Sequence, residues 1–234
     1  MYNRIVLNEP HASIEGLYDD KLSFWNIDAR FLNDVVIKWT DWHTDFLFHG
    51  IRDERIRTVR FPYSRFIVDA ERLLNDPMES IGQGIVYKQF DGYIRKPSVK
   101  AENKLLRLWQ WHQKRLSSQL TENALLLDCH SFPSHLSDVD ICIGYNENWS
   151  KPDKAVIETA VNIFEDTGYK VGINDPYSNS ETPACPFHYQ SMMLEVNKKA
   201  YLQNDSINLK IGHNYRSNLS DVISTLISRL LNCY

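Results

Sequence analysis

Residues 124–130 read ALLLDCH, so an unbroken apolar run leads directly into an aspartate and a histidine. Such a run is typical of a strand that is buried on both faces, as in a parallel sheet. The stretches 4–8 (RIVLN) and 189–196 (YQSMMLEV) have the same character, and they too lead to polar residues. The sequence therefore predicts three central strands with polar residues at or near their ends.

Amphipathic segments separate these strands, and apolar residues recur in them at helical spacing. The predicted helices cover 40–50, with Thr40 as the N-cap, 98–120, 152–167 and 220–231, with Ser220 as the N-cap. Strands that alternate with helices predict an α/β fold. We expect a three-layer sandwich with a mixed, mostly parallel central sheet.

Two further stretches are less regular. Residues 56–69 read as one or two strands broken at Pro62, because proline cannot donate to a ladder. Residues 81–97 contain several glycines and read as a long loop. Loops of this length in a compact domain are often functional lids.

Composition limits the function classes. The chain has 234 residues, 43% hydrophobic and 24% charged, which predicts one globular domain over 1–234. The formal net charge is -4 and no basic tract stands out, so nucleic acid is not an expected partner. No apolar run is long enough for a membrane span, and no secretory signal is evident. We therefore expect a cytoplasmic protein that does not bind membranes.

The chemistry-bearing residues share one placement, at or near the ends of the predicted central strands. His11 follows the first strand, Asp128 and His130 end the second, and Glu195 lies near the end of the third. In open α/β sheets the carboxyl ends of the strands build the ligand crevice. Two histidines with carboxylates are the parts of a hydrolytic zinc site, which leaves one position for water. On the residues alone, isolated structural roles for these side chains stay open.

Several segments resemble the N-formylglutamate amidohydrolase family. The most specific parts are the Asp-x-His-Ser segment around His130 and the motif SRFIVD. The main matching segments are RIVLNEPHASIEG (4–16), TDWHTDFLF (40–48), YSRFIVDAER (63–72) and LLLDCHSFPS (125–134), with weaker matches at 138–148, 171–183 and 193–202. The resemblance covers most of the chain in the same order.

This resemblance implies a fold similar to that of zinc carboxypeptidases and zinc amidases, a phosphorylase/hydrolase-like sandwich. It implies that His11 and His130 bind one divalent metal ion, with zinc as the expected metal. It also implies that Glu195 is the general base that activates a metal-bound water.

The third metal ligand is expected to be Asp41, at the start of the predicted helix. Glu15 is a rival because zinc carboxypeptidases take a glutamate from the loop of the first histidine. Asp45 is another rival because it lies one turn further on the same helix face. The alternative for Asp41 is an acidic residue that favours the first helical turn.

The motif around Asp69 carries the expected substrate contacts. The resemblance makes Arg65 and Arg72 candidates for binding an acidic substrate, Arg72 through the α-carboxylate and Arg65 also as a helper for the oxyanion. The usual motif has an asparagine where this chain has Glu71, and an acidic residue there would weaken binding of a dianion. The alternative is that Arg65 and Asp69 form a pair on one strand face.

Two residues beside the second histidine complete the expected site. Asp128 would orient a ligand or substrate, and Ser131 would donate a hydrogen bond nearby. The function that the resemblance implies is hydrolysis of an N-acyl acidic amino acid, N-formyl-L-glutamate first, with a place in histidine degradation. The alternatives are a zinc carboxypeptidase or cell-wall amidase acting on peptides, and a protein that kept the fold without the chemistry.

Overall fold

The computed structural model describes residues 2–204, 208–211 and 219–232. The chain forms two compact units. The first, called the sheet unit, comprises Met1–Glu9, His43–Val59 and Leu116–Tyr234. The second, called the loop unit, comprises Pro10–Trp42 and Arg60–Arg115. Each unit is therefore assembled from stretches that are separate in the sequence.

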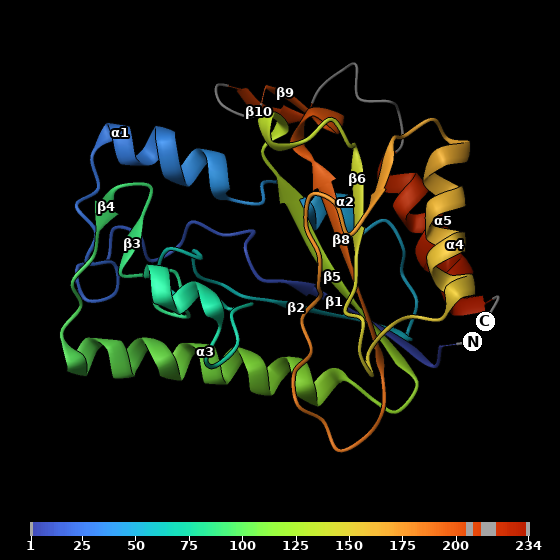
Figure 1. Cartoon of the computed structure of the whole chain (residues 1–234), viewed down its shortest axis with the longest axis horizontal. Helices are drawn as coiled ribbons and strands as arrows, with labels where there is room; N and C mark the ends of the chain where they lie inside the picture. Colours follow the sequence, from blue (N-terminus) through green and yellow to red (C-terminus); the bar gives the residue numbers. More distant parts are fainter. Residues whose placement is uncertain (1, 205–207, 212–218, 233–234) are drawn as a thin grey trace. The chain divides into compact units, whose positions relative to one another are not determined.

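A six-stranded sheet forms the centre of the sheet unit, in the order β2-β1-β5-β8-β6-β7 (Figure 1). The pairs β1–β5, β5–β8 and β6–β7 are parallel, whereas β6 and β8 are antiparallel. The expected α/β fold with a mixed, mostly parallel sheet is confirmed. The strands are β1 (Arg4–Glu9), β2 (Ile56–Arg60), β5 (Ala124–Phe132), β6 (Ile141–Gly144), β7 (Val171–Ile173) and β8 (Gln190–Asn197).

Helices α2 (Thr44–Phe48), α4 (Lys154–Asp166) and α5 (Leu219–Asn232) pack with one face of this sheet. Figure 1 shows α4 and α5 side by side. Alternate strand residues such as Leu125 and Leu127 belong to the same apolar core as these helices. The intervening Leu126 belongs to a second core that includes Leu116, at the end of α3. This alternation follows from the two-residue repeat of a strand.

Short elements complete the sheet unit. A two-stranded antiparallel sheet joins β9 and β10. Their bounds are Leu202–Asn204 for β9 and Asn208–Ile211 for β10, and two 3-10 helices cover Ser134–Leu136 and Lys198–Ala200.

The loop unit has little regular structure before its long helix α3 (Val99–Gln119), which continues into the sheet unit beyond Arg115. Aromatic side chains fill its core, with Phe66 in edge contact with Phe31, Phe90 and Tyr87. Its other elements are α1 (Ala29–Phe31), a π-helix over Leu32–Ile37, a 3-10 helix over Pro77–Ile81, and the hairpin of β3 (Gln89–Phe90) and β4 (Tyr93–Ile94).

Buried Arg95 connects loops of this unit through hydrogen bonds to their backbone. Its guanidinium donates to the backbone carbonyls of Leu22, Ser23 and Ile67, at 2.7, 2.5 and 3.0 Å. Burial lowers the pKa of Arg95 to about 10, so the side chain remains charged at neutral pH. One side chain thereby donates to three carbonyl groups of irregular backbone. Buried carbonyl groups without a donor would cost free energy of folding.

The predicted helix at 40–50 begins later than expected. The helix α2 starts at Thr44 after His43, whose φ is 59°, so Thr40 is not its N-cap. The amide of Asp41 instead donates to the carbonyl of His11 at 3.1 Å, within the loop unit. Asp41 therefore precedes the helix and does not owe its place to the helix dipole.

Two other local expectations also need correction. Residues after Pro62 do not form a strand, because the amides of Ile67 and Val68 donate back to the carbonyl of Ser64 and close a turn. Helix α5 begins at Leu219, so Ser220 lies inside the helix and is not its cap. Within the described residues, none of the helices combines the length and the apolar character needed to cross a membrane.

Candidate functional site

The polar residues of the sheet unit gather on the sheet face opposite the helices. Leu127 and Cys129 lie in the helix-side core, so the intervening Asp128, and His130 beyond it, point to the other face. Leu194 lies in the same core, so the next residue, Glu195, also points away from the helices.

Strand register places these residues beside one another within the sheet unit. His130 on β5 is the register partner of Glu195 on β8, and Asn8 on β1 is the partner of Asp128. Neighbouring strands lie about 4.8 Å apart, so an imidazole and a carboxylate stand on adjacent positions of one face. Ser131 follows His130 and therefore points to the helix side, next to Val196. Ser131 is thus not on the face that carries His130.

Asp128 is the centre of the hydrogen bonds on this face. Its carboxylate accepts from Asn8 Nδ2 at 2.8 Å and from the amide of Glu181 at 3.1 Å, and lies 3.2 Å from His130 Nε2. Burial alone would raise the pKa of Asp128, but His130, the Glu181 amide and Asn8 outweigh burial and hold this pKa below its usual range. The buried carboxylate is therefore ionised and positioned to orient the imidazole of His130.

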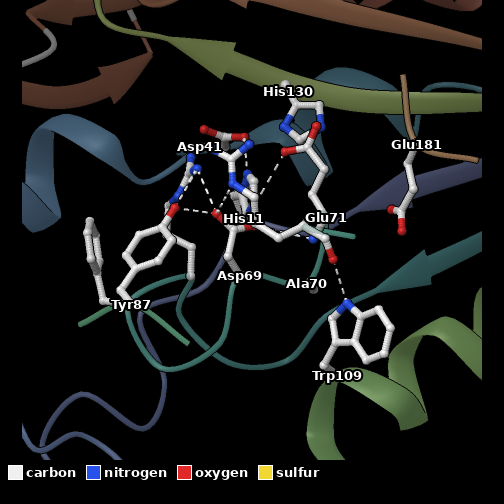
Figure 2. Close-up of polar contacts among 12 residues, drawn as sticks. His11, Asp41, Asp69, Ala70, Glu71, Tyr87, Trp109, His130 and Glu181 are labelled. Carbon is white, nitrogen blue, oxygen red and sulfur yellow. Dashed lines mark hydrogen bonds and ion pairs between the residues drawn. The ribbon is translucent and has the colours of Figure 1, made fainter. Parts of the chain in front are cut away.

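Glu181 is a residue of this face that the sequence analysis did not single out. Its carboxylate accepts from Asn8 Nδ2 at 2.9 Å, and its backbone carbonyl accepts from Ser191 Oγ at 2.7 Å. Figure 2 labels it together with His130. Glu181 lies in an irregular segment without periodicity, and only the weak match at 171–183 pointed to that segment.

Glu195 is almost buried, with 9% of its surface exposed. Its register partner on the other side is Cys142 of β6. Burial raises the pKa of the Cys142 thiol to about 11, and the charge of Glu195 adds to the shift. The thiol is therefore protonated at neutral pH, and Glu195 is the group on these two positions that can accept a proton.

The loop unit carries the other polar cluster, which centres on Asp69 (Figure 2). His11 Nε2 lies 2.8 Å from Asp69 Oδ1, while Arg65 Nη2 and the Tyr87 hydroxyl donate to Asp69 Oδ2, the former at 3.0 Å. Burial alone would raise the pKa of Asp69, but His11, Arg65 and Arg72 outweigh burial and hold it well below the usual range. Asp69 is therefore an ionised carboxylate that fixes the orientation of the His11 ring.

Asp41 lies on the other side of the same ring. Its Oδ2 is 3.7 Å from His11 Nδ1, and both residues are buried. Two ligand atoms that each bind one ion at about 2.0–2.2 Å can be at most about 4 Å apart, so this pair fits one metal ion. A histidine whose second nitrogen contacts a carboxylate, here Asp69, is the usual arrangement of a metal ligand. The donor chemistry therefore suits a divalent ion.

The rival ligands have different surroundings. Glu15 and Asp45 are exposed. Asp45 Oδ1 accepts from the amide of Phe46 at 2.9 Å, and Asp45 belongs to the sheet unit, not to the loop unit that contains His11. Among the three candidates, Asp41 is the one whose carboxylate lies beside the His11 ring in the same unit.

The two arginines of the motif are both engaged by carboxylates. Arg65 pairs with Asp69, and Arg72 lies 3.7 Å from Asp69 and 3.7 Å from Asp76. Burial would lower the pKa of Arg65, but the surrounding groups, Tyr87 and Asp69 foremost, raise it well above its usual value. Both guanidinium groups are therefore permanently charged. Arg65 does pair with Asp69, as in the alternative interpretation, but in a turn and not on a strand face.

Helix α3 holds the backbone of this motif. Trp109 Nε1 donates to the carbonyl of Arg72 at 2.8 Å, and Gln113 Nε2 donates to the carbonyl of Ala70 at 2.9 Å (Figure 2 shows the Trp109 contact). The two donors are four residues apart, so they lie on one face of the helix. The segment with Asp69 is irregular, and these side chains replace the hydrogen bonds that a strand would supply.

Comparison with known proteins agrees with these observations. The sequence model of the N-formylglutamate amidohydrolase family matches residues 4–202. The N-formylglutamate amidohydrolase of Ralstonia eutropha JMP134 superimposes with a TM-score of 0.76 at 17% identity, over 98% of this chain and 93% of that one. A gene product of Agrobacterium tumefaciens superimposes with a TM-score of 0.66 at 15% identity, over 98% and 92%. No curated protein matches the chain.

Proposed function

Because the chain belongs to the N-formylglutamate amidohydrolase family and is therefore an amidohydrolase, we propose that it is a metal-dependent enzyme that hydrolyses the amide of a small N-acyl amino acid. Zinc is the proposed ion. The observation that carries the metal dependence is the His11 ring, which has Asp69 at one nitrogen and Asp41 at the other. The expected N-formyl-L-glutamate is the reference substrate.

The proposed ligands are His11 and Asp41 of the loop unit and His130 of the sheet unit. A bound ion supplies a water of lowered pKa and polarises the substrate carbonyl. Asp69 and Asp128 hold the two imidazoles in orientation through the contacts described above. These roles are supported by the donor chemistry within each unit and by the family.

Glu195 is the proposed general base. Its carboxylate takes a proton from the attacking water and delivers it to the leaving amine nitrogen, which matches proton loss at one atom with proton gain at the other. Its support is the register partnership with His130 on adjacent strands. The proposed role of Arg72, and of Arg65 beside it, is to bind the α-carboxylate of the substrate.

A hydrolysis screen tests this function. N-formyl, N-acetyl and N-succinyl amino acids are incubated with the zinc-loaded protein and with protein treated with a chelator, and the free amino acid is quantified. Release of amino acid only in the zinc-loaded sample is the expected result. Equal release after chelation would contradict the metal dependence, and no release from any compound would contradict the proposed substrate class.

A further inference from the structure

Carboxylates outnumber guanidinium groups around His11 in the loop unit. Asp69, Asp41 and Glu71 lie 2.8, 3.7 and 3.8 Å from the ring nitrogens of His11. A fourth carboxylate, Asp76, lies beside Arg72. Arg65 and Arg72 supply positive charge against these acids, through ion pairs with Asp69 and through the nearby charges of Asp41 and Glu71. Four carboxylates against two arginines leave two negative charges. One divalent cation would neutralise these two charges, so no net positive charge would remain.

Both arginines lie beside carboxylates of the protein, but each keeps a donor that makes no hydrogen bond among the described residues. Arg65 Nη2 contacts both Asp69 and the Tyr87 hydroxyl, at 3.0 and 3.1 Å. Arg72 lies between Asp69 and Asp76. Arg65 Nε and Arg72 Nε, which are both buried, make no hydrogen bond within the part of the chain that the structure describes. These two N–H groups match the two oxygens of one carboxylate.

Glu71 is the most exposed of these four acids, and Asp76 follows at 18%. Its side chain is 26% exposed, whereas Asp69 is fully buried and Asp41 is 3% exposed. The charge of Glu71 acts on both arginines, since it is among the charges that raise the pKa values of Arg65 and Arg72, so it would also repel a second carboxylate of a ligand bound there.

We propose that Glu71 determines the substrate class, which is a monoanionic N-acyl amino acid with an uncharged side chain, and that it disfavours dianions such as N-formyl-L-glutamate. This inference rests on the proposed function, because it takes the acyl amino acid as the ligand. It narrows that function from a small N-acyl amino acid to one with a single carboxylate.

The experiment compares two ligands of the same shape. N-formyl-L-glutamine and N-formyl-L-glutamate differ by one charge, and both are titrated into the zinc-loaded protein by calorimetry and assayed for hydrolysis. The wild-type protein should bind the glutamine compound at least about tenfold more tightly, as one close charge at moderate screening implies. Glu71→Gln should remove that preference, while Glu79→Gln, which removes an exposed acid of the same unit, should retain it.

Each outcome decides the inference. Tighter binding of the glutamate compound by the wild-type protein, binding of neither compound, or an unchanged preference in Glu71→Gln would overturn it. Loss of zinc from Glu71→Gln in elemental analysis would also overturn it, because Glu71 would then act on the ion. The proposed function fails separately, if the ligands bind and no acyl amino acid of the screen is hydrolysed.

Discussion

At the scale of single residues, Asp69 contacts four side chains of the proposed site in the loop unit. It touches His11, Arg65 and Tyr87 through hydrogen bonds and lies within ion-pair distance of Arg72. Its charge lies between two arginines, and its Oδ1 sets the orientation of the His11 ring. Asp69 therefore links the arginines of the motif to the proposed metal ligand.

Asp69→Asn should weaken zinc binding by roughly 10–100-fold, the usual cost of losing a carboxylate that orients a metal-binding histidine. Competition with a chromophoric chelator measures the affinity. Asp76→Asn is the matched control, because Asp76 also lies near Arg72, whereas the carboxylates close to His11 are those of Asp41, Asp69 and Glu71. Equal affinities of Asp69→Asn and wild type, with the fold retained by circular dichroism, would refute the positioning role.

Glu195→Gln should abolish turnover and leave zinc content unchanged, because the amide keeps the shape of the side chain but cannot accept a proton at neutral pH. We expect a loss of kcat of at least about 10²-fold, as for removal of a general base. Steady-state kinetics and elemental analysis of the same sample give both values. Near-normal turnover would show that another group is the base.

At the scale of elements, the sequence predicted those parts whose pattern repeats. The three buried strands and the amphipathic helices at 98–120, 152–167 and 220–231 were found because their apolar residues recur at strand or helix spacing. The turn at Ser64 and the late start of α2 were missed, because hydrogen bonds to residues distant in sequence override local propensity. The amide of Ser64 donates to the Glu15 carbonyl, and that of Asp41 to the His11 carbonyl. The antiparallel strand β6 lies in a segment that was noted only as a weak family match.

The same reasoning explains which site residues could be predicted from the sequence. His130 and Glu195 could be found because each lies near the end of an apolar run, and register then places them side by side. Tyr87 and Glu181 could not be found this way. Each lies in an irregular segment, and its role depends on a hydrogen bond to a carboxylate or an asparagine far away in the chain.

The hydrogen bonds from helix α3 to the backbone of residues 70–72 lead to a prediction. Trp109→Phe keeps an aromatic ring but removes the indole N–H that donates to the Arg72 carbonyl, so it should destabilise the protein by about 1 kcal/mol or more. It should also increase amide exchange in residues 70–72. Urea unfolding and hydrogen exchange measure these effects. Trp111→Phe, on an exposed side chain of the same helix, is the control and should change neither.

Arg95 provides a prediction about the loops of the same unit. Arg95→Met should destabilise the protein by about 3 kcal/mol or more, since three buried carbonyls lose their donor at about 1–3 kcal/mol each. Urea unfolding measures the change. Arg30→Met is the control, because its exposed pair with Asp34 should contribute less than about 1 kcal/mol. Equal effects of the two substitutions would show that the carbonyls find other partners.

At the scale of the whole molecule, the chain passes between the two units at four places, after Glu9, Trp42, Val59 and Arg115. Neither unit is one continuous stretch, so tests of the metal site use the intact chain. The proposed ligands belong to different stretches: His11 and Asp41 lie just inside the loop unit at two of these crossings, and His130 lies in the sheet unit.

A ligand that binds only the folded chain stabilises it by about 2.7 kcal/mol when its free concentration is 100 times the dissociation constant. Zinc should therefore raise the unfolding temperature of the wild-type protein relative to a chelated sample, with one ion bound per chain. His11→Ala and His130→Ala should each abolish this difference.

The comparison uses the zinc-minus-chelator difference of every variant, because His11→Ala also removes a buried partner of Asp69 and lowers stability without zinc. His112→Ala, a buried histidine in edge contact with Phe61, is the control and should keep the full zinc effect. If His130→Ala also kept the full zinc effect, His130 would not be a ligand of the ion, and the proposed ligand set would be wrong.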